Sequence, residues 1–259
     1  GLPMVKLEKF LDPLPIPRTL KPKYKNKKET YYEVRMIQAY QCLHSELPDT
    51  LIWGYEGTFP GPVINVRRNE KVLIKWKNEL PEKHFLPVDK TLHGVADAPE
   101  ARSVVHLHGA RVRPESDGYP EAWYTKEFAR KGPSFRRTEY WYPNRQPAAT
   151  LWYHDHAIGL TRLNVYAGLA GFYLIRDRAE RKLNLPKGRY EIPLLIQDRS
   201  FNPDGSLSYP RQPEPPNLEI DPCITPGVDG DTILVNGRVW PYLEVEPRKL
   251  LRSFPVLLE

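Results

Sequence analysis

The sequence predicts an all-β fold, either a Greek-key β-sandwich or a β-barrel. Proline accounts for 28 of the 259 residues, about twice the usual share of roughly 5%, and it favours short strands and ordered loops over helices. About seven short segments between residues 30 and 177 have strand-like patterns, and no segment has the long apolar period of a confident helix. Many short strands separated by turns are typical of sandwiches and barrels.

The individual strands follow from alternation of apolar and polar residues. Residues 1–29 are rich in proline and lysine, so we expect an irregular segment that wraps the surface. The first two strands lie in YYEVRM and EKVLIKWKN, where one face carries Tyr32, Val34 and Met36, and Val72, Ile74 and Trp76, respectively. We expect a rigid corner at FPGP, further strands at SVVHLHG, TEYWYPN, ATLWYHDH and GLAGFYLIRD, and a short helical turn in AIGLTRLNVYAG.

The chain divides into four predicted parts. An irregular segment at 1–29 precedes a first sandwich domain at 30–177, a charged connector at 178–190 and a second β unit at 191–259. In the second unit, Asn236-Gly237 is a strong hairpin signal. We expect this unit to be an incomplete domain, because it has too few strands to close a sandwich of its own.

Composition and charge exclude several classes of protein. The net charge of +6 is mild, and we expect the basic run at 21–28 to be a solvated segment. No basic module interleaved with aromatic residues indicates nucleic-acid binding, and no apolar run approaches a membrane span. The first residues lack the pattern of a signal peptide, so we expect cytoplasmic synthesis without export. Cys42 and Cys223 leave one disulfide open but form no disulfide framework.

Four of the seven histidines occur in two H-x-H pairs, His106 with His108 in VVHLHG and His154 with His156 in LWYHDH. By chance, about 0.2 such pairs are expected in a chain with this many histidines. Residues i and i+2 of a strand point the same way, so neighbouring strands would gather four imidazoles on one patch. Imidazole is a leading ligand of Zn, Cu, Fe and Ni. The pairs therefore predict a metal site.

The identity of the metal stays open at this level. Four histidines without an adjacent cysteine suit one tetrahedral zinc ion, although two pairs on separate strands more naturally serve more than one ion. Asp117 and Asp155 are candidates to orient an imidazole or move protons, but Asp155 points to the opposite face, which favours a structural role. The other histidines, His44, His84 and His93, lack partners at ligand spacing, so we expect them in loops or on the surface.

Five longer stretches resemble the multicopper oxidases, and most closely the bacterial spore-coat laccases that also oxidise bilirubin. They are LEKFLDPLPIP, WGYEGTFPGP, VVHLHGARVRPESDGYPEAW, LWYHDHAIGLTRLNVYAGLAGFYLIRD and TILVNGRVWPYLEVEPRK. Together they extend from about Lys6 to Lys249. The resemblance implies that the all-β fold is a cupredoxin-like Greek-key β-sandwich followed by part of a second cupredoxin-like domain.

The resemblance also implies a function. Members of this family oxidise phenols, diamines or bilirubin-like pigments and reduce O2 to water. By the family pattern, His106 would bind a type 2 copper, whereas His108, His154 and His156 would bind a type 3 copper pair. Asp117 matches an acidic residue that helps protons reach this trinuclear cluster. The implied partners are O2, small aromatic reductants and spore coat proteins, and the implied location is the spore coat.

The sequence departs from the family pattern in what it lacks. The family carries its other four cluster ligands and its blue-copper ligands in H-P-x-H-x-H and H-C-H segments, and neither segment occurs here. Seven histidines cannot supply the eight cluster ligands plus two at a type 1 copper. After Lys249 the match ends in LLRSFPVLLE, as in an interrupted oxidase. We therefore expect half a cluster, no type 1 site and no activity of the chain alone.

Two alternatives remain at the level of sequence. One is a non-catalytic copper-binding protein or a structural component of the coat. The other is a zinc hydrolase, which needs a general base and an open coordination position, and for which Asp117 is the only candidate base.

Overall fold

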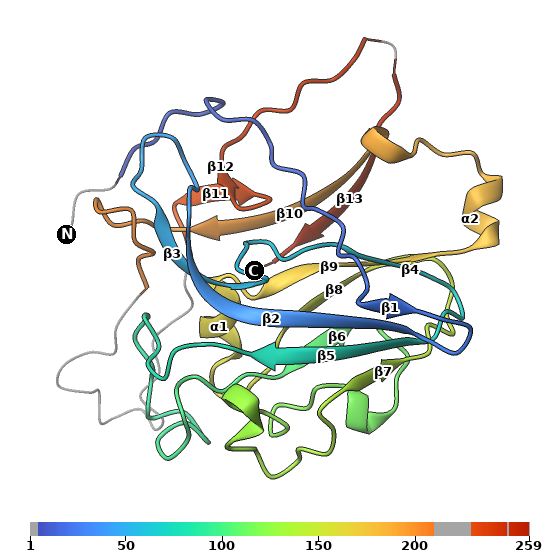
Figure 1. The fold of residues 1–259 in the computed structure, drawn as a ribbon. Helices are drawn as coiled ribbons and strands as arrows, with labels where there is room; N and C mark the ends of the chain where they lie inside the picture. The colour runs from blue at the N-terminus through green and yellow to red at the C-terminus, as the bar shows by residue number, and fades with distance from the viewer. Residues whose placement is uncertain (1–4, 210–228, 248, 259) are drawn as a thin grey trace.

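The computed structural model describes residues 5–209, 229–247 and 249–258, and this part of the chain contains three β-sheets (Figure 1). The first sheet has the order β1-β2-β5-β7, with β3 also paired to β2. Its strands are β1 (Tyr24–Lys25), β2 (Thr30–Gln41), β3 (Thr50–Tyr55), β5 (Val72–Asn78) and β7 (Tyr140–Tyr142).

The second sheet faces the first and has the order β4-β9-β8-β6. Its strands are β4 (Ile64–Arg67), β9 (Ala170–Arg176), β8 (Ala149–Asp155) and β6 (Val105–His108). The β2–β5 and β4–β9 pairs are parallel, so they require crossover connections rather than hairpins. These two packed sheets confirm the predicted all-β sandwich.

The alternation read from the sequence accounts for the core between these two sheets. In β2 and β5, the six predicted apolar residues are all buried. Across the sandwich, Tyr55 and Trp76 of the first sheet meet Tyr153 of β8, with ring centroids 4.9 and 5.2 Å from that of Tyr153. Aromatic rings in such tilted and edge contacts add to the stability gained from burial alone.

The second unit contains a third sheet, with the order β12-β11-β10-β13. Its strands are β12 (Arg238–Val239), β11 (Thr232–Val235), β10 (Glu191–Arg199) and β13 (Arg252–Leu257). Asn236 and Gly237 join β11 to β12 with φ values of 51° and 71°, as a type I′ hairpin turn requires. This confirms the hairpin.

Strand β9 connects the second unit to the first because both of its faces are buried. Tyr173 and Ile175 belong to the main core. On the other face, Phe172 packs in a separate cluster with Leu195 of β10 and Phe254 of β13. The N-terminal segment adds hydrogen bonds to the second unit, among them one from the backbone N–H of Phe10 to the carbonyl of Trp240 at 2.8 Å.

The structure differs from the sequence expectations at four places. Strand β1 interrupts the segment predicted to be irregular, and β3 occupies residues 50–55, where no strand was predicted. The connector contains a short helix, α2 (Arg178–Lys182), because the Asp177 side chain accepts a hydrogen bond from the backbone N–H of Glu180. The tail after Lys249 forms β13, parallel to the distant strand β10. The domain boundaries themselves stay a prediction.

The remaining helical elements are short. They are α1 (Thr161–Ala167), which confirms the expected helical turn, and the 3-10 turns η1 (Pro114–Ser116), η2 (Lys126–Phe128) and η3 (Gly188–Tyr190). Of the helices that the structure describes, none combines the length and the apolar character needed to cross a membrane. Cys223 lies outside the described residues, so its pairing with Cys42 stays untested.

The loop between β6 and β7 depends on a glycine. Gly118 has a φ of 74° and lies so close to β6 that an added Cβ would collide with the carbonyl of Val105. Gly188, in η3, has a similar φ of 63°, but an added Cβ would meet nothing within 4 Å. The two glycines therefore share the same backbone constraint and differ in packing.

We predict that Gly118→Ala destabilises the protein by about 1–3 kcal/mol more than Gly188→Ala does, since overpacking typically costs that much. Both variants place an alanine in a left-handed backbone conformation, so the difference between their stabilities reports the collision with β6. Urea unfolding of both variants checks this. Equal losses in the two variants would show that the loop can move away from β6.

His84 lies inside the protein in its neutral form. The backbone N–H of Leu86 donates to Nδ1 at 3.0 Å, and Nε2 donates to Oδ1 of Asn164 at 2.8 Å. The ring also packs on Trp53, with centroids 3.9 Å apart. Burial lowers the pKa of His84 from 6.5 to about 4, and this outweighs the opposing effects of Asn164 and Glu100. Folding therefore disfavours the charged imidazole.

This pKa predicts a loss of stability in acid. Between pH 6.5 and about 4 the unfolded chain binds the His84 proton and the folded chain does not, so stability is present above pH 6.5 and is lost as the pH falls. We expect a loss of about 2 kcal/mol between pH 7 and pH 5 from this group. Urea unfolding at both pH values should show that loss in the wild type and in the control His93→Gln, whose parent side chain is exposed. His84→Gln should lose about 2 kcal/mol less than these two proteins over the same pH change, and an identical pH dependence in all three proteins would refute the assignment.

Candidate metal centre

Strands β6 and β8 bring the four paired histidines together. The antiparallel register places His106 opposite His154 and His108 opposite Trp152. His156 continues the pairing beyond β8, because its backbone N–H donates to the carbonyl of Val104 at 2.8 Å. Alternation then turns all four imidazoles to the same face, whereas the residues between them point into the core.

The four rings form a compact group. The ring centroid of His106 lies 4.8 Å from that of His156 and 5.6 Å from those of His108 and His154. His154 lies 5.6 Å from His108 and 5.7 Å from His156 by the same measure. No other part of the described structure brings so many histidine rings together.

Backbone carbonyls fix the tautomer of three of these rings. Nδ1 of His106 lies 2.6 Å from the carbonyl oxygen of Asp117, Nδ1 of His156 lies 2.8 Å from that of Gly118, and Nδ1 of His154 lies 2.7 Å from that of Asp155. A carbonyl only accepts hydrogen bonds, so each Nδ1 carries the proton and donates it. Each Nε2 therefore keeps a free lone pair, as a metal ligand must.

His108 is oriented differently. Its Nδ1 lies 3.4 Å from Nε2 of His154. Two nitrogens that each lie about 2.0–2.1 Å from one ion at a tetrahedral angle are roughly 3.3–3.4 Å apart. The pair is therefore spaced to share one ion. The Nε2 atoms of His106 and His156 are not part of this pair.

The environment disfavours the charged form of two of the imidazoles. Burial, with smaller contributions from the neighbouring His106, His156 and His108, lowers the pKa of His154 to about 3 against the raising effect of its hydrogen bond to the Asp155 carbonyl. Burial also lowers the pKa of His108, with smaller contributions from His106 and His156. Metal ions bind the neutral form of histidine, so these two rings need not lose a proton to bind a metal near neutral pH.

Asp117 lies between His106 and the solvent. Its carbonyl accepts the hydrogen bond described above, and its Oδ1 is 3.6 Å from Nδ1 of the same ring. The Asp117 side chain is 30% exposed. A carboxylate in this position is close to the histidine and is also accessible to water.

Asp155, by contrast, is buried on the opposite face, as expected for a structural residue. Its carboxylate accepts hydrogen bonds from the backbone N–H groups of Val104 and Ala157 at 3.3 and 3.0 Å. Burial raises its pKa to about 7, against the lowering effect of those bonds. The side chain thereby ties the beginning of β6 to the end of β8.

The remaining histidines lie apart from this group. All three are in loops, as predicted, but His44 and His84 are buried rather than at the surface. Burial is possible because both nitrogens of each ring have partners; in His44, Nε2 donates to the carbonyl of Glu8 at 2.8 Å and Nδ1 accepts from the backbone N–H of Glu46. Within the described ranges, no three or more His, Cys, Asp or Glu side chains are arranged around a single metal position.

The sequence interpretation missed two contributors to the site. Trp152 was given no role from the sequence, and its ring stacks on His154 and His108, with centroids 4.0 and 5.2 Å from theirs. The carbonyls of Asp117 and Gly118 orient two imidazoles, although a sequence carries no signal for a backbone acceptor. The S-D-G turn was a sequence signal for these backbone acceptors, because it brings the chain back beside β6.

Comparisons with known proteins agree with this geometry. The sequence profile of the multicopper oxidase family matches residues 37–101 and 95–180, more than half of the chain. A laccase from Bacillus subtilis (strain 168) is 58% identical over 94% of this chain and 48% of its own length. A laccase from Haloferax volcanii is 42% identical over 94% of this chain and 42% of its own length. The chain spans about half the length of the curated relatives it matches.

Solved structures show the same likeness. The crystal structure of a laccase from Pediococcus acidilactici superposes with a TM-score of 0.70 at 29% sequence identity, covering 93% of this chain and 44% of that one. A multicopper oxidase from Campylobacter jejuni shares the fold, with a TM-score of 0.65 at 22% identity. Both likenesses agree with the sandwich and with the resemblance of the motifs. This chain therefore belongs to the multicopper oxidase family, a family of copper-dependent oxidoreductases.

Proposed function

We propose that this chain supplies half of the ligands of a trinuclear copper cluster in a laccase-type oxidase. In this proposal His106 binds the type 2 copper, and His108, His154 and His156 bind the type 3 pair. The observation that carries the proposal is the register of β6 against β8, which gathers the four imidazoles on one face.

The donor set fits copper. Imidazole nitrogens are suitable ligands for copper ions, and three of the rings keep Nε2 free because Nδ1 is hydrogen-bonded. The 3.4 Å separation between Nδ1 of His108 and Nε2 of His154 supports a type 3 ion shared by these two residues. When bound, copper at such a cluster supplies the reduction of O2 to water with electrons from a reducing substrate.

The residues of this chain orient the histidine ligands and shield them from water. The carbonyls of Asp117 and Gly118 hold His106 and His156, so that neither ring has to reorganise when it binds a metal. Trp152 covers one side of His154 and His108 and keeps water from that side. Asp117 moves protons between solvent and the cluster, since its carboxylate is partly exposed and lies beside His106.

The substrates we propose are phenols, diamines or bilirubin-like pigments, with O2 as the acceptor. They follow from the resemblance of the motifs, and the name laccase of two relatives that are 58% identical to this chain supports them. Association with spore coat proteins and location in the spore coat stay predictions from the same resemblance.

The 259 residues hold seven histidines, which is fewer than a full cluster and a type 1 site need together. We therefore propose that this chain alone binds copper weakly and does not turn over. Taken alone it would be a non-catalytic copper-binding protein, and activity would require ligands beyond these residues.

The first test measures copper retention. We expect the purified 259-residue chain, dialysed to equilibrium against a fixed free copper concentration, to retain copper and to show no O2-dependent oxidation of a phenol. His108→Ala should retain clearly less, because it removes a ligand that is exposed and can be truncated without opening the core. His93→Ala is the matched control and should retain as much as the wild type. Equal retention in all three proteins would contradict the site, and phenol oxidation by the chain alone would contradict its inactivity.

The second test addresses Asp117 in an active oxidase that contains these residues. Asp117→Asn should lower kcat about tenfold or more, because a positioned proton carrier typically contributes at least that much, while copper content stays the same. Glu115→Gln removes a neighbouring carboxylate that forms no contact with His106 and should be nearly as active as the wild type. The pH profile of kcat should change only in the Asp117 variant. If the rate falls only as far as copper content falls, Asp117 has no part in proton transfer.

A further inference from the structure

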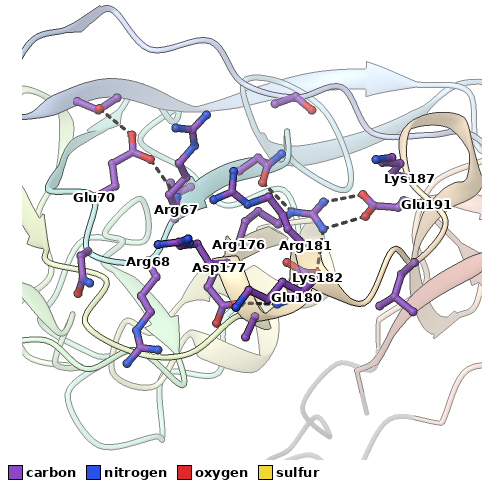
Figure 2. Close-up of a pocket in the computed structure, with 18 of the residues that line it drawn as sticks. Arg67, Arg68, Glu70, Arg176, Asp177, Glu180, Arg181, Lys182, Lys187 and Glu191 are labelled. Carbon is purple, nitrogen blue, oxygen red and sulfur yellow. Dashed lines mark hydrogen bonds and ion pairs between the residues drawn. The ribbon is translucent and has the colours of Figure 1, made fainter.

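A large open cavity of the described structure lies away from the histidines. It has a volume of about 1310 Å³ and is lined by the segment before β2, the end of β4, the turn after it, the end of β9, α2 and the first residues of β10 and β13 (Figure 2). None of the four paired histidines lines it. Its volume exceeds the roughly 300–1,000 Å³ of most small-ligand pockets.

The wall of this cavity is strongly basic. Nine of the residues that line it are Lys or Arg and four are Asp or Glu, which gives a net formal charge of +5. The whole chain carries +6. Almost all of the excess positive charge is therefore concentrated in one concave surface, where field lines converge and attract anions.

Two of the four carboxylates are neutralised by two arginines. Arg176 contacts Glu191 at 2.7 Å and Glu180 at 3.3 Å, and Arg252 contacts Glu180 at 2.7 Å and Glu191 at 3.6 Å. Figure 2 shows Arg176 between Glu180 and Glu191. These four residues form a closed network without net charge.

Glu70 is also occupied. It accepts hydrogen bonds from Oγ1 of Thr30 at 2.8 Å and from the backbone N–H of Arg67 at 3.0 Å, and it pairs with Lys25 at 3.6 Å. It therefore holds the backbone of the turn after β4 and leaves the Arg67 side chain without an acidic partner.

Asp177 is occupied by the backbone. It accepts hydrogen bonds from the N–H groups of Glu180 and Ala148 at 2.7 and 2.9 Å. These bonds hold its pKa below the usual value, and the nearby charge of Arg68 contributes less. Asp177 serves as the N-cap of α2 and pairs directly with none of the lining cations.

Six cations of the wall remain. Within the described ranges, none of their side chains forms an ion pair: Arg67, Arg68, Arg178, Arg181, Lys182 and Lys187. In Figure 2, Arg67 and Arg68 lie on the left, Arg181 and Lys182 lie on α2 beside Glu180, and Lys187 lies near Glu191 on the right. An anion bound among these cations would reduce their mutual repulsion.

We propose that this cavity binds a small polyphosphate, either inorganic or esterified as in a nucleoside triphosphate. Four of the six free cations are arginines, whose planar guanidinium groups bind phosphate oxygens in pairs. A chain of three phosphates carries about four or five negative charges near neutral pH, which matches the wall, and a single phosphate would leave most of the cavity and its charge unused.

The test is a calorimetric titration of the purified protein with inorganic tripolyphosphate and, separately, with ATP, at about 0.15 M salt, where surface charges are screened beyond about 8 Å. The protein is dialysed free of loose copper, which tripolyphosphate would chelate. We expect one ligand per chain and at least tenfold weaker binding of orthophosphate. The stronger of the two triphosphates identifies whether the inorganic or the esterified form is the better ligand.

Two triple variants that remove the same charge are compared: one changes the cavity wall, and the other is the control outside it. Arg67→Gln, Arg181→Gln and Lys182→Gln together should weaken tripolyphosphate binding at least tenfold. Lys83→Gln, Lys90→Gln and Lys126→Gln remove the same charge from exposed positions outside the cavity wall and should leave binding unchanged. Both triples should unfold at the temperature of the wild type. Equal weakening in both triples, or no binding by the wild type, would overturn the proposal. A DNA oligonucleotide that displaced tripolyphosphate through the same three residues would also overturn it, in favour of a nucleic-acid site.

Discussion

The metal centre depends on the pairing register between β6 and β8. Because side chains alternate along a strand, a slip of one residue would send the histidines of one strand into the core and Val105 and Leu107, or Tyr153 and Asp155, to the outer face. Burying several imidazoles and exposing these residues would be costly on both faces. The same hydrophobic pattern that stabilises the sandwich therefore positions the ligands, and the fold needs no separate device to bring four imidazoles together.

The polypeptide backbone also orients three of the four imidazoles. The turn after η1 brings the chain back beside β6 at Gly118. The carbonyls of Asp117 and Gly118 in this turn accept hydrogen bonds from Nδ1 of His106 and Nδ1 of His156, respectively. Asp155 connects the backbone of the two strands from the opposite face. Burial and the neighbouring imidazoles lower the pKa of His108 and His154, so these two rings are prepared to bind a cation. The cavity beside α2 has the opposite character, because its charge is fixed on arginines and lysines that stay protonated and can be balanced only by an anion.

These two regions also differ in how the chain builds them. The histidines come from two adjacent strands of one sheet. The basic cavity combines residues near 25, 67, 178 and 252. Arg67 lies opposite Arg176 in the β4–β9 pair, and Arg252 joins them through its contacts with Glu180 and Glu191.

The sequence by itself determined the features that follow from local periodicity. The period of two in β2, β5, β6 and β8 predicted the core faces and put each pair of histidines on one side of its strand, and Asn236-Gly237 predicted its hairpin. Motif resemblance then indicated the family. Only the tertiary structure decided that β6 lies beside β8 in the register that opposes His106 and His154, because strand pairing across 48 residues depends on the packing of the whole sandwich. It also decided that the tail after Lys249 pairs with β10, that His44 and His84 are buried, and that scattered cations line one cavity. These outcomes depend on long-range contacts and backbone acceptors, which no local pattern of side chains encodes.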